Sequence, residues 1–120
     1  MTPVGCSVLV VDDNPGFRGL ACRILQSWGH DVIEAGTAAE ALSQMVERAP
    51  QVALVDIGLP DDNGLELARQ LLRIAPTACV VVTSSDADAG FSTAARDVGA
   101  VFFAKDELTS PQLEQLLGEL

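Results

Sequence analysis

Basic residues are scarce in this sequence. Seven lysines and arginines face 17 aspartates and glutamates among 120 residues, which gives a formal net charge of -10. The six arginines are scattered along the chain, whereas a surface that binds nucleic-acid phosphates needs clustered cations. We therefore expect no direct contact between this domain and nucleic acid. If DNA is involved, another polypeptide segment contacts it.

Long hydrophobic runs are also missing. Apolar residues make up 48% of the chain, yet no stretch reaches the length of a membrane span. The N-terminus lacks the basic-then-apolar pattern of a signal peptide. These absences predict a cytoplasmic protein without membrane contact.

Cysteine and histidine show no metal-binding pattern. Cys6, Cys22 and Cys79 are an odd number without metal-type spacing, and each lies in an apolar segment. We expect these thiols to be reduced and packed in the core. The single histidine, His30, stands near a turn with no ligand set around it, so we expect an ordinary surface side chain.

Five short runs rich in β-branched residues predict strands. The first, third and fourth runs are almost continuously apolar, as in strands that helices cover on both faces. The predicted strands are Ser7–Val11, Val32–Ala35, Val52–Val55, Cys79–Val82 and Val101–Ala104.

Between these runs, apolar residues recur at helical spacing. Gly29 is typical of a stop after the first helix, and Thr37 with Glu40 forms a capping-box pattern before the second. Asn63 precedes the third helix, and Ser110 followed by proline opens the fifth.

Alternating strands and helices with short connections require right-handed crossovers, a parallel sheet and helices on both faces. We therefore predict an α/β fold of the (βα)₅ type, a flavodoxin-like three-layer sandwich with a five-stranded parallel sheet. A single domain should span residues 1–120.

Polar residues collect where the predicted strands end. Asp12 and Asp13 follow the first strand, Asp56 the third, Thr83 the fourth and Lys105 the fifth. In a doubly wound sheet these ends share one edge, where ligands bind. Any one of these aspartates, taken alone, is more typical of a helix cap. Converging carboxylates repel one another unless a cation joins them, so the set favours Mg²⁺, with Lys105 opposite and suited to a phosphoryl oxygen.

The sequence resembles the receiver domains of two-component response regulators. The resemblance covers essentially the whole chain, through VLVVDDNPGFR, VALVDIGLPDDNGLEL, VVVTSSD and GAVFFAKDEL. It implies the strand order 2-1-3-4-5. It also implies that Asp56 is the phosphoacceptor, and that Mg²⁺ is held by Asp12, Asp13, Asp56 and the backbone carbonyl of Gly58. In such a site Lys105 contacts the phosphoryl group.

The resemblance also implies a switch. Thr83 matches the switch hydroxyl and Phe102 the switch aromatic, although the neighbouring Phe103 leaves the choice of aromatic open. One departure is Asp106, which stands where most receivers have proline after the lysine. We expect a trans peptide there, and an Asp106 carboxylate that partly holds Lys105 when the site is empty.

A receiver of this kind accepts a phosphoryl group from a sensor histidine kinase or a histidine phosphotransfer protein. It is its own phosphotransferase and a slow phosphatase, because water can attack the same phosphorus. Gly58 and Ser85 are small, which predicts open access for that water. The fourth helix, fifth strand and fifth helix should form the surface that changes, and it would act on an output partner, a missing C-terminal effector domain or a second, phosphorylated copy.

Other interpretations remain open. A pseudo-receiver would be a pure interaction module that never accepts phosphate. Phosphatases of the haloacid dehalogenase type use similar residues, but they place the nucleophile first as D-x-D and bind metal with a later acidic pair, whereas here the acidic pair comes first, which argues against that class. The chain is either a single-domain regulator or the receiver part of a longer one.

Overall fold

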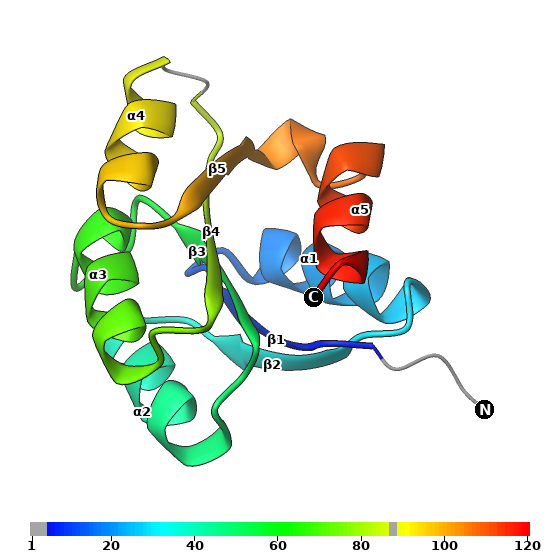
Figure 1. Cartoon of the computed structure of the whole chain (residues 1–120), viewed down its shortest axis with the longest axis horizontal. Coiled ribbons are helices and arrows are strands. Elements are labelled where there is room, and N and C mark those ends of the chain that lie inside the picture. Colours follow the sequence, from blue (N-terminus) through cyan, green and yellow to red (C-terminus); the bar gives the residue numbers. More distant parts are fainter. Residues whose placement is uncertain (1–4, 87–88) are drawn as a thin grey trace.

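The computed structural model describes residues 5–86 and 89–120. Strands and helices alternate along these residues, and a short 3₁₀ helix, η1, precedes the last helix (Figure 1). The strands are β1 (Ser7–Val11), β2 (Asp31–Ala35), β3 (Val52–Asp56), β4 (Cys79–Ser84) and β5 (Val101–Ala104). The helices are α1 (Pro15–Ser27), α2 (Ala38–Arg48), α3 (Gly64–Ile74), α4 (Ala89–Asp97), η1 (Lys105–Glu107) and α5 (Pro111–Gly118).

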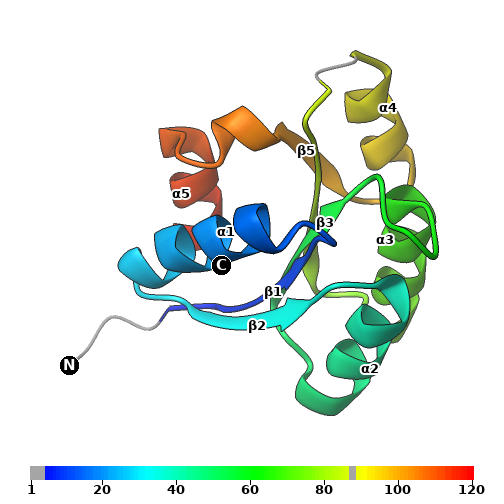
Figure 2. The same cartoon turned by 180° about the vertical axis from the view of Figure 1, so that it is seen from behind.

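The strands form one parallel sheet in the order β2-β1-β3-β4-β5. Helices α1 and α5 cover one face, and α2, α3 and α4 cover the other (Figures 1 and 2). The predicted (βα)₅ three-layer sandwich and its strand order are confirmed. This order makes β1 and β3 neighbours at the centre of the sheet, where their C-terminal ends lie side by side.

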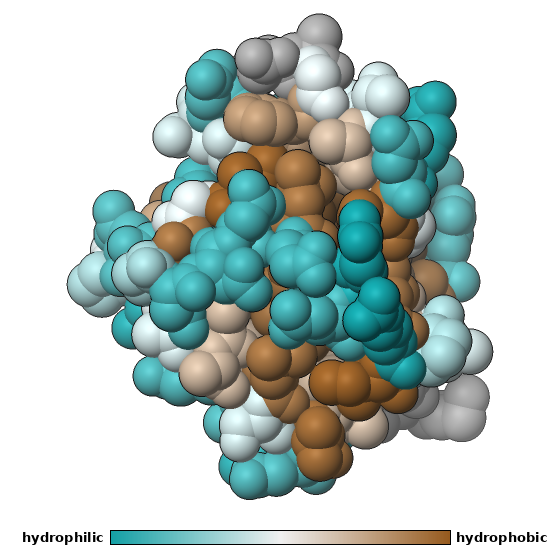
Figure 3. All heavy atoms as spheres, turned by 90° about the vertical axis from the view of Figure 1, so that its left-hand side faces the viewer, coloured by the Kyte–Doolittle hydropathy of each residue, from teal (hydrophilic) through white to brown (hydrophobic). Residues whose placement is uncertain are grey.

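The core has two layers because successive strand residues point to opposite faces of the sheet. On β1, Leu9 and Val11 pack towards α2 and α3, whereas Val8 and Val10 pack towards α1 and α5. Every residue of β3 is buried. On the outer side formed by α2, α3 and α4, apolar and polar side chains interleave (Figure 3).

The helix ends follow the local sequence signals. The Thr37 hydroxyl accepts a hydrogen bond from the Glu40 amide (3.2 Å), and the Ser110 hydroxyl accepts one from Leu113 (3.3 Å). Gly29 adopts φ +91°, a left-handed conformation that glycine tolerates, and it ends α1 as predicted. None of the helices in the described part of the chain is long and apolar enough to cross a bilayer.

The surface position predicted for His30 is wrong. The side chain is 8% exposed, and its Nδ1 accepts a hydrogen bond from the Cys6 amide (2.9 Å). The amide of Asp31 donates to the carbonyl of Cys6 (3.0 Å), so pairing of the first two strands brings His30 onto the chain that enters β1. The cysteines are free as expected, and burial raises the pKa of each thiol.

Candidate phosphoryl-transfer site

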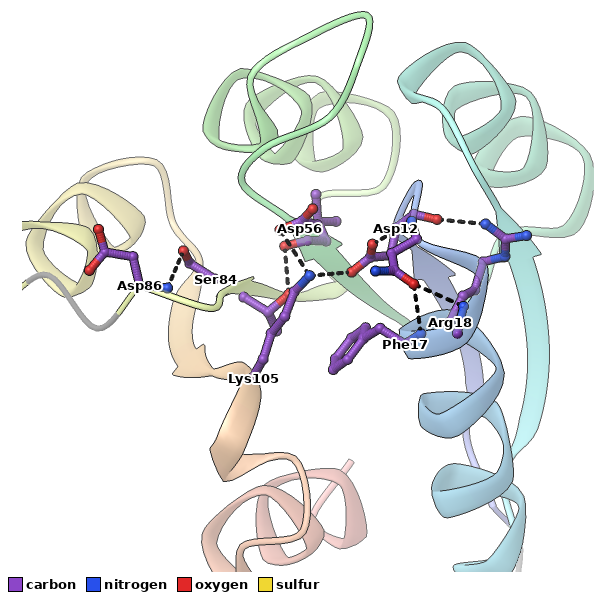
Figure 4. Close-up of polar contacts among 11 residues, drawn as sticks. Asp12, Phe17, Arg18, Asp56, Ser84, Asp86 and Lys105 are labelled. Atoms are coloured by element: carbon purple, nitrogen blue, oxygen red, sulfur yellow. Dashed lines mark hydrogen bonds and ion pairs between the residues drawn. The ribbon is translucent and has the colours of Figure 1, made fainter.

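The polar residues expected at the strand ends meet at one edge of the sheet (Figure 4). Val11 pairs with Val55, so the residues that follow, Asp12 and Asp56, lie next to each other. One carboxylate oxygen from each of Asp12, Asp13 and Asp56 lies within 4.8 Å of the others. The clustering predicted from the sequence is therefore present.

Asp12 is 1% exposed. Its Oδ1 accepts a hydrogen bond from the Asn14 amide (2.9 Å), whereas Oδ2 is paired, among the described residues, only with Lys105 Nζ at 2.8 Å. A carboxylate oxygen has two lone pairs, so an Oδ2 that meets one cation can bind a second. Together with two neighbouring carboxylates it forms the all-oxygen donor set that Mg²⁺ prefers, so the residues present fit the predicted ion.

Arg18 was not identified from the sequence as a site residue, and it holds the loop that carries the acidic pair. Its Nη1 donates to the backbone carbonyl of Asp12 (2.7 Å), and its Nε pairs with Glu34 of β2 (3.0 Å). The guanidinium thereby connects α1, β2 and the end of β1 (Figure 4). An arginine one turn into a helix that follows two aspartates was the only available signal.

Lys105 lies between two carboxylates. Its Nζ is 2.8 Å from Asp12 Oδ2 and 3.6 Å from Asp56 Oδ1, and the Phe17 ring centroid is 4.5 Å from Nζ. The predicted hold of Asp106 on Lys105 is wrong: in the described part of the chain the lysine pairs with Asp12 and Asp56. The chain has no cis peptide among its described residues, as predicted for this bond.

The turn that carries Lys105 closes without a proline. The Glu107 carboxylate accepts a hydrogen bond from the amide of Ala104, the last residue of β5 (2.9 Å). The side chain of Asp106 is exposed at this turn and points its charge to solvent. The lysine is therefore free to reach across the sheet edge to the deeper carboxylates.

The pKa of Asp56 is raised above that of an ordinary aspartate. Burial raises its pKa, and the negative charge of Asp12 raises it further, while Lys105 and the Gly58 amide act in the opposite direction. A divalent cation at the cluster would favour the ionised form.

Thr83 is the β4 neighbour of Asp56 in the sheet register. It is 2% exposed, and its hydroxyl donates to the Val55 carbonyl (3.4 Å), a long hydrogen bond. Phe102 packs on the side of α4, where its ring centroid is 5.8 Å from that of Phe91. Phe103 pairs with Thr83 in the register and packs towards α1 and α5. The two aromatic side chains therefore pack on opposite faces of the sheet.

Gly58 follows β3 on an exposed part of the β3–α3 loop, residues 57–63. A methyl group built on Gly58 would meet no atom within 4 Å. Ser85, after β4, is also exposed. Both small residues are therefore exposed, just after the strands that carry Asp56 and Thr83.

Residues 8–117 match the family model of the response regulator receiver domain. The chain belongs to this family. Among curated relatives of this receiver domain, the transcriptional regulatory protein KdpE of Mycobacterium tuberculosis is 38% identical over 104 residues, which are 87% of this chain and 44% of that protein. A protein-glutamate methylesterase/protein-glutamine glutaminase of Agrobacterium fabrum is 38% identical over 96 residues, 78% of this chain and 27% of that protein. The receiver domain therefore spans less than half the length of these relatives.

Solved structures agree with the fold. A response regulator receiver domain protein of Methanospirillum hungatei superimposes with a TM-score of 0.84 and 26% identity, over 97% of this chain and 96% of that one. A response regulator of Burkholderia pseudomallei, with a phosphorylated aspartic acid and a calcium ion, gives a TM-score of 0.78 and 27% identity, over 96% of this chain and 75% of that one.

Proposed function

We propose that this receiver domain accepts a phosphoryl group on Asp56, in a Mg²⁺-dependent reaction, from a sensor histidine kinase or a histidine phosphotransfer protein. The observation that carries the proposal is the position of Asp56 beside Asp12 and 3.6 Å from the ammonium of Lys105. The phosphorylated aspartic acid in the Burkholderia relative supports it. Free cysteines fit the cytoplasm, where the kinase would act.

Asp12, Asp13, Asp56 and the Gly58 carbonyl would hold the ion. Bound Mg²⁺ would neutralise negative charge that develops on the transferring phosphoryl oxygens. The Oδ2 atom of Asp12 supports this assignment, because it is buried and, among the described residues, its one close partner is the Lys105 ammonium.

Asp56 and Lys105 would carry out the phosphoryl transfer itself. A carboxylate oxygen of Asp56 attacks phosphorus, the P–N bond to the donor imidazole breaks, and the bonding electrons leave with the nitrogen. The Lys105 ammonium, which pairs with the carboxylates of Asp12 and Asp56 before phosphorylation, would then contact a phosphoryl oxygen as a point charge. Dephosphorylation would be a separate reaction: water attacks the same phosphorus, the P–O bond to Asp56 breaks, and inorganic phosphate leaves past Gly58 and Ser85.

Phosphorylation would act on α4, β5 and α5. The Thr83 hydroxyl is only weakly held by the Val55 carbonyl, so a nearby phosphoryl oxygen can draw it towards Asp56. Phe102 would then change its packing, and its contact with Phe91 would pass the change to α4. The groove between α4, β5 and α5, about 520 Å³ in volume, lies on this surface.

The output would be a binding event. The greater length of the curated relatives favours an effector domain beyond the receiver, and a separate output protein or a phosphorylation-dependent dimer would use the same surface. With a net charge of -10, the receiver would leave any contact with nucleic acid to another segment.

Intact-mass measurement tests the proposal. The native chain and Asp56→Asn are incubated with acetyl phosphate, with Mg²⁺ or with excess chelator. The native chain should gain one phosphoryl group only with Mg²⁺, and Asp56→Asn should gain none. A native chain that binds Mg²⁺ but gains no mass would instead favour a pseudo-receiver, a pure interaction module.

A further inference from the structure

Asp61 connects two parts of the fold that are distant in sequence. It lies in the β3–α3 loop, and its Oδ1 and Oδ2 accept hydrogen bonds from the Ala38 amide (2.8 Å) and the Ala39 amide (3.2 Å). These two amides begin α2 and have no partner inside the helix. The loop that follows the acceptor aspartate is therefore fastened to the N-terminus of α2.

The hydrogen bonds between the Asp61 carboxylate and the amides of α2 are charge-assisted. The two amide hydrogen bonds lower the pKa of Asp61, so its carboxylate is ionised at neutral pH. A negative charge at a helix N-terminus also interacts favourably with the helix dipole. The Thr37 hydroxyl accepts a hydrogen bond from the Glu40 amide, whereas the first two amides of α2 donate to Asp61.

The other end of the loop is closed by backbone contacts. The Gly64 amide donates to the Ile57 carbonyl (2.8 Å), and Gly58 forms a bridge with Asn63. Asp61 lies between Gly58 and Asn63 in the chain. Its contact with α2 therefore holds the middle of the loop, which the two backbone contacts at the ends of the loop do not reach. The loop is therefore attached at its base and, through Asp61, to α2.

We propose that Asp61 is a positioning residue for metal binding: its carboxylate holds residues 57–63 against α2 and thereby orients the Gly58 carbonyl towards the cluster of Asp12, Asp13 and Asp56. The inference rests on the proposed function, because that function makes the Gly58 carbonyl a Mg²⁺ ligand. It adds to the site a residue that does not touch the ion.

Two simpler effects of Asp61 can be separated from positioning. The sole effect of Asp61 could be to stabilise α2, in which case its removal lowers the stability of the fold without weakening metal binding. Its charge could attract Mg²⁺ through space, in which case the neighbouring Asp62 would do the same. The Asp62 carboxylate accepts a hydrogen bond from the adjacent Asn63 amide (2.7 Å), and in the described part of the chain it forms no hydrogen bond with α2. Asp62→Ala is therefore a matched control for Asp61→Ala.

Calorimetric titration with Mg²⁺ compares the native chain, Asp61→Ala and Asp62→Ala at one ionic strength. For Asp61→Ala the dissociation constant should rise about three- to tenfold, at or below the lower end of the about 10- to 100-fold typical when a ligand's direct partner is lost. Asp62→Ala should stay within about twofold of the native value, as expected of a partly exposed charge without a contact to the metal ligands among the described residues. With acetyl phosphate, Asp61→Ala should need more Mg²⁺ for half-maximal phosphorylation but keep the native rate at saturating Mg²⁺.

Amide hydrogen exchange of the metal-free proteins tests the attachment separately from the metal. Residues 57–63 should exchange faster in Asp61→Ala than in the native chain and Asp62→Ala. Equal Mg²⁺ affinity of the two variants, or a lower unfolding midpoint with native affinity, would overturn the positioning role. A native chain that binds no Mg²⁺ refutes the proposed function and the metal role together, whereas native binding with unchanged loop exchange in Asp61→Ala refutes the inference alone.

Discussion

Lys105 Nζ lies 2.8 Å from Oδ2 of Asp12, a carboxylate that is 1% exposed. The same ammonium lies 3.6 Å from Oδ1 of Asp56. The only lysine of the chain thus offsets the charge of two buried acids at the point where a divalent cation would bind. Lysine and metal are therefore alternative ways to stabilise the same pair of carboxylates.

Replacement of the lysine tests this relationship. Lys105→Met keeps the aliphatic length but leaves Asp12 and Asp56 without a cation. The free energy of unfolding at neutral pH without metal should fall by about 1–3 kcal/mol, less than the about 3–5 kcal/mol of a fully buried pair, because the lysine is partly exposed. Saturating Mg²⁺ should remove most of this loss. Urea unfolding measures both values, and an equal loss with and without Mg²⁺ would contradict the prediction.

The raised pKa of Asp56 predicts a pH dependence. Between the ordinary aspartate pKa and the raised one, the folded protein binds more protons at this group than the unfolded chain does. The contribution of Asp56 to stability therefore falls as pH rises through that window. With chelator present, Asp56→Asn should be more stable than the native chain at neutral pH, and the difference should close as the pH falls below about 3.9. Urea unfolding at both pH values measures the difference in the free energy of unfolding between Asp56→Asn and the native chain. A difference that does not change with pH would argue against the raised pKa.

Phe17 should hold the lysine in place. Its ring faces Lys105 Nζ at 4.5 Å, and Phe17→Leu keeps the apolar bulk without the ring face. Phosphorylation by acetyl phosphate should slow about two- to fivefold, the equivalent of about 0.5–1 kcal/mol for a partly exposed cation–π contact. Leu20→Ala, at an exposed position on the same helix, is the control and should keep the native rate. An equal loss in both variants would assign the effect to α1 rather than to the lysine contact.

Two glycines near Asp56 should respond differently to a methyl group. A Cβ on Gly64 would overlap the backbone carbonyl of Asp56, whereas a Cβ on Gly58 meets open space. Gly64→Ala should lose about 3 kcal/mol or more of stability, because backbone atoms must shift. Gly58→Ala should stay within about 0.5 kcal/mol of the native chain. Thermal unfolding of both variants checks the contrast, and similar midpoints would show that the loop accommodates the methyl group at Gly64.

Local signals were enough to predict the elements. The strands Ser7–Val11 and Val101–Ala104 have the predicted bounds, and the other strands differ by one or two residues at an end. Helix caps such as Thr37 and Ser110 also lie where the sequence indicates. These signals work because they depend on hydrogen bonds and side-chain periodicity within a few residues. The parallel sheet follows from the alternation of strands and helices alone.

Other features depend on segments that are far apart in the chain. The sequence suggested Asp106 as a partner of Lys105, but the ends of the neighbouring β1 and β3 offer Asp12 and Asp56. These carboxylates lie deeper, where the Coulomb attraction to an ammonium is less screened by water than at the exposed Asp106. His30 is buried because strand pairing places the Cys6 amide against it. Neither partner lies close enough in sequence for any local pattern to indicate it.

The sequence by itself determined the order of strands and helices, the apolar faces that pack the two layers, and the set of acids and the lysine at one edge of the sheet. Only the tertiary structure decided which of these charges meet, that Arg18 holds the Asp12 carbonyl, and that Asp61 reaches the first turn of α2. The physical reason is range. Secondary structure and caps arise from neighbours in the chain, whereas burial and charge pairing arise when the folded sheet brings distant segments within a few ångströms of one another.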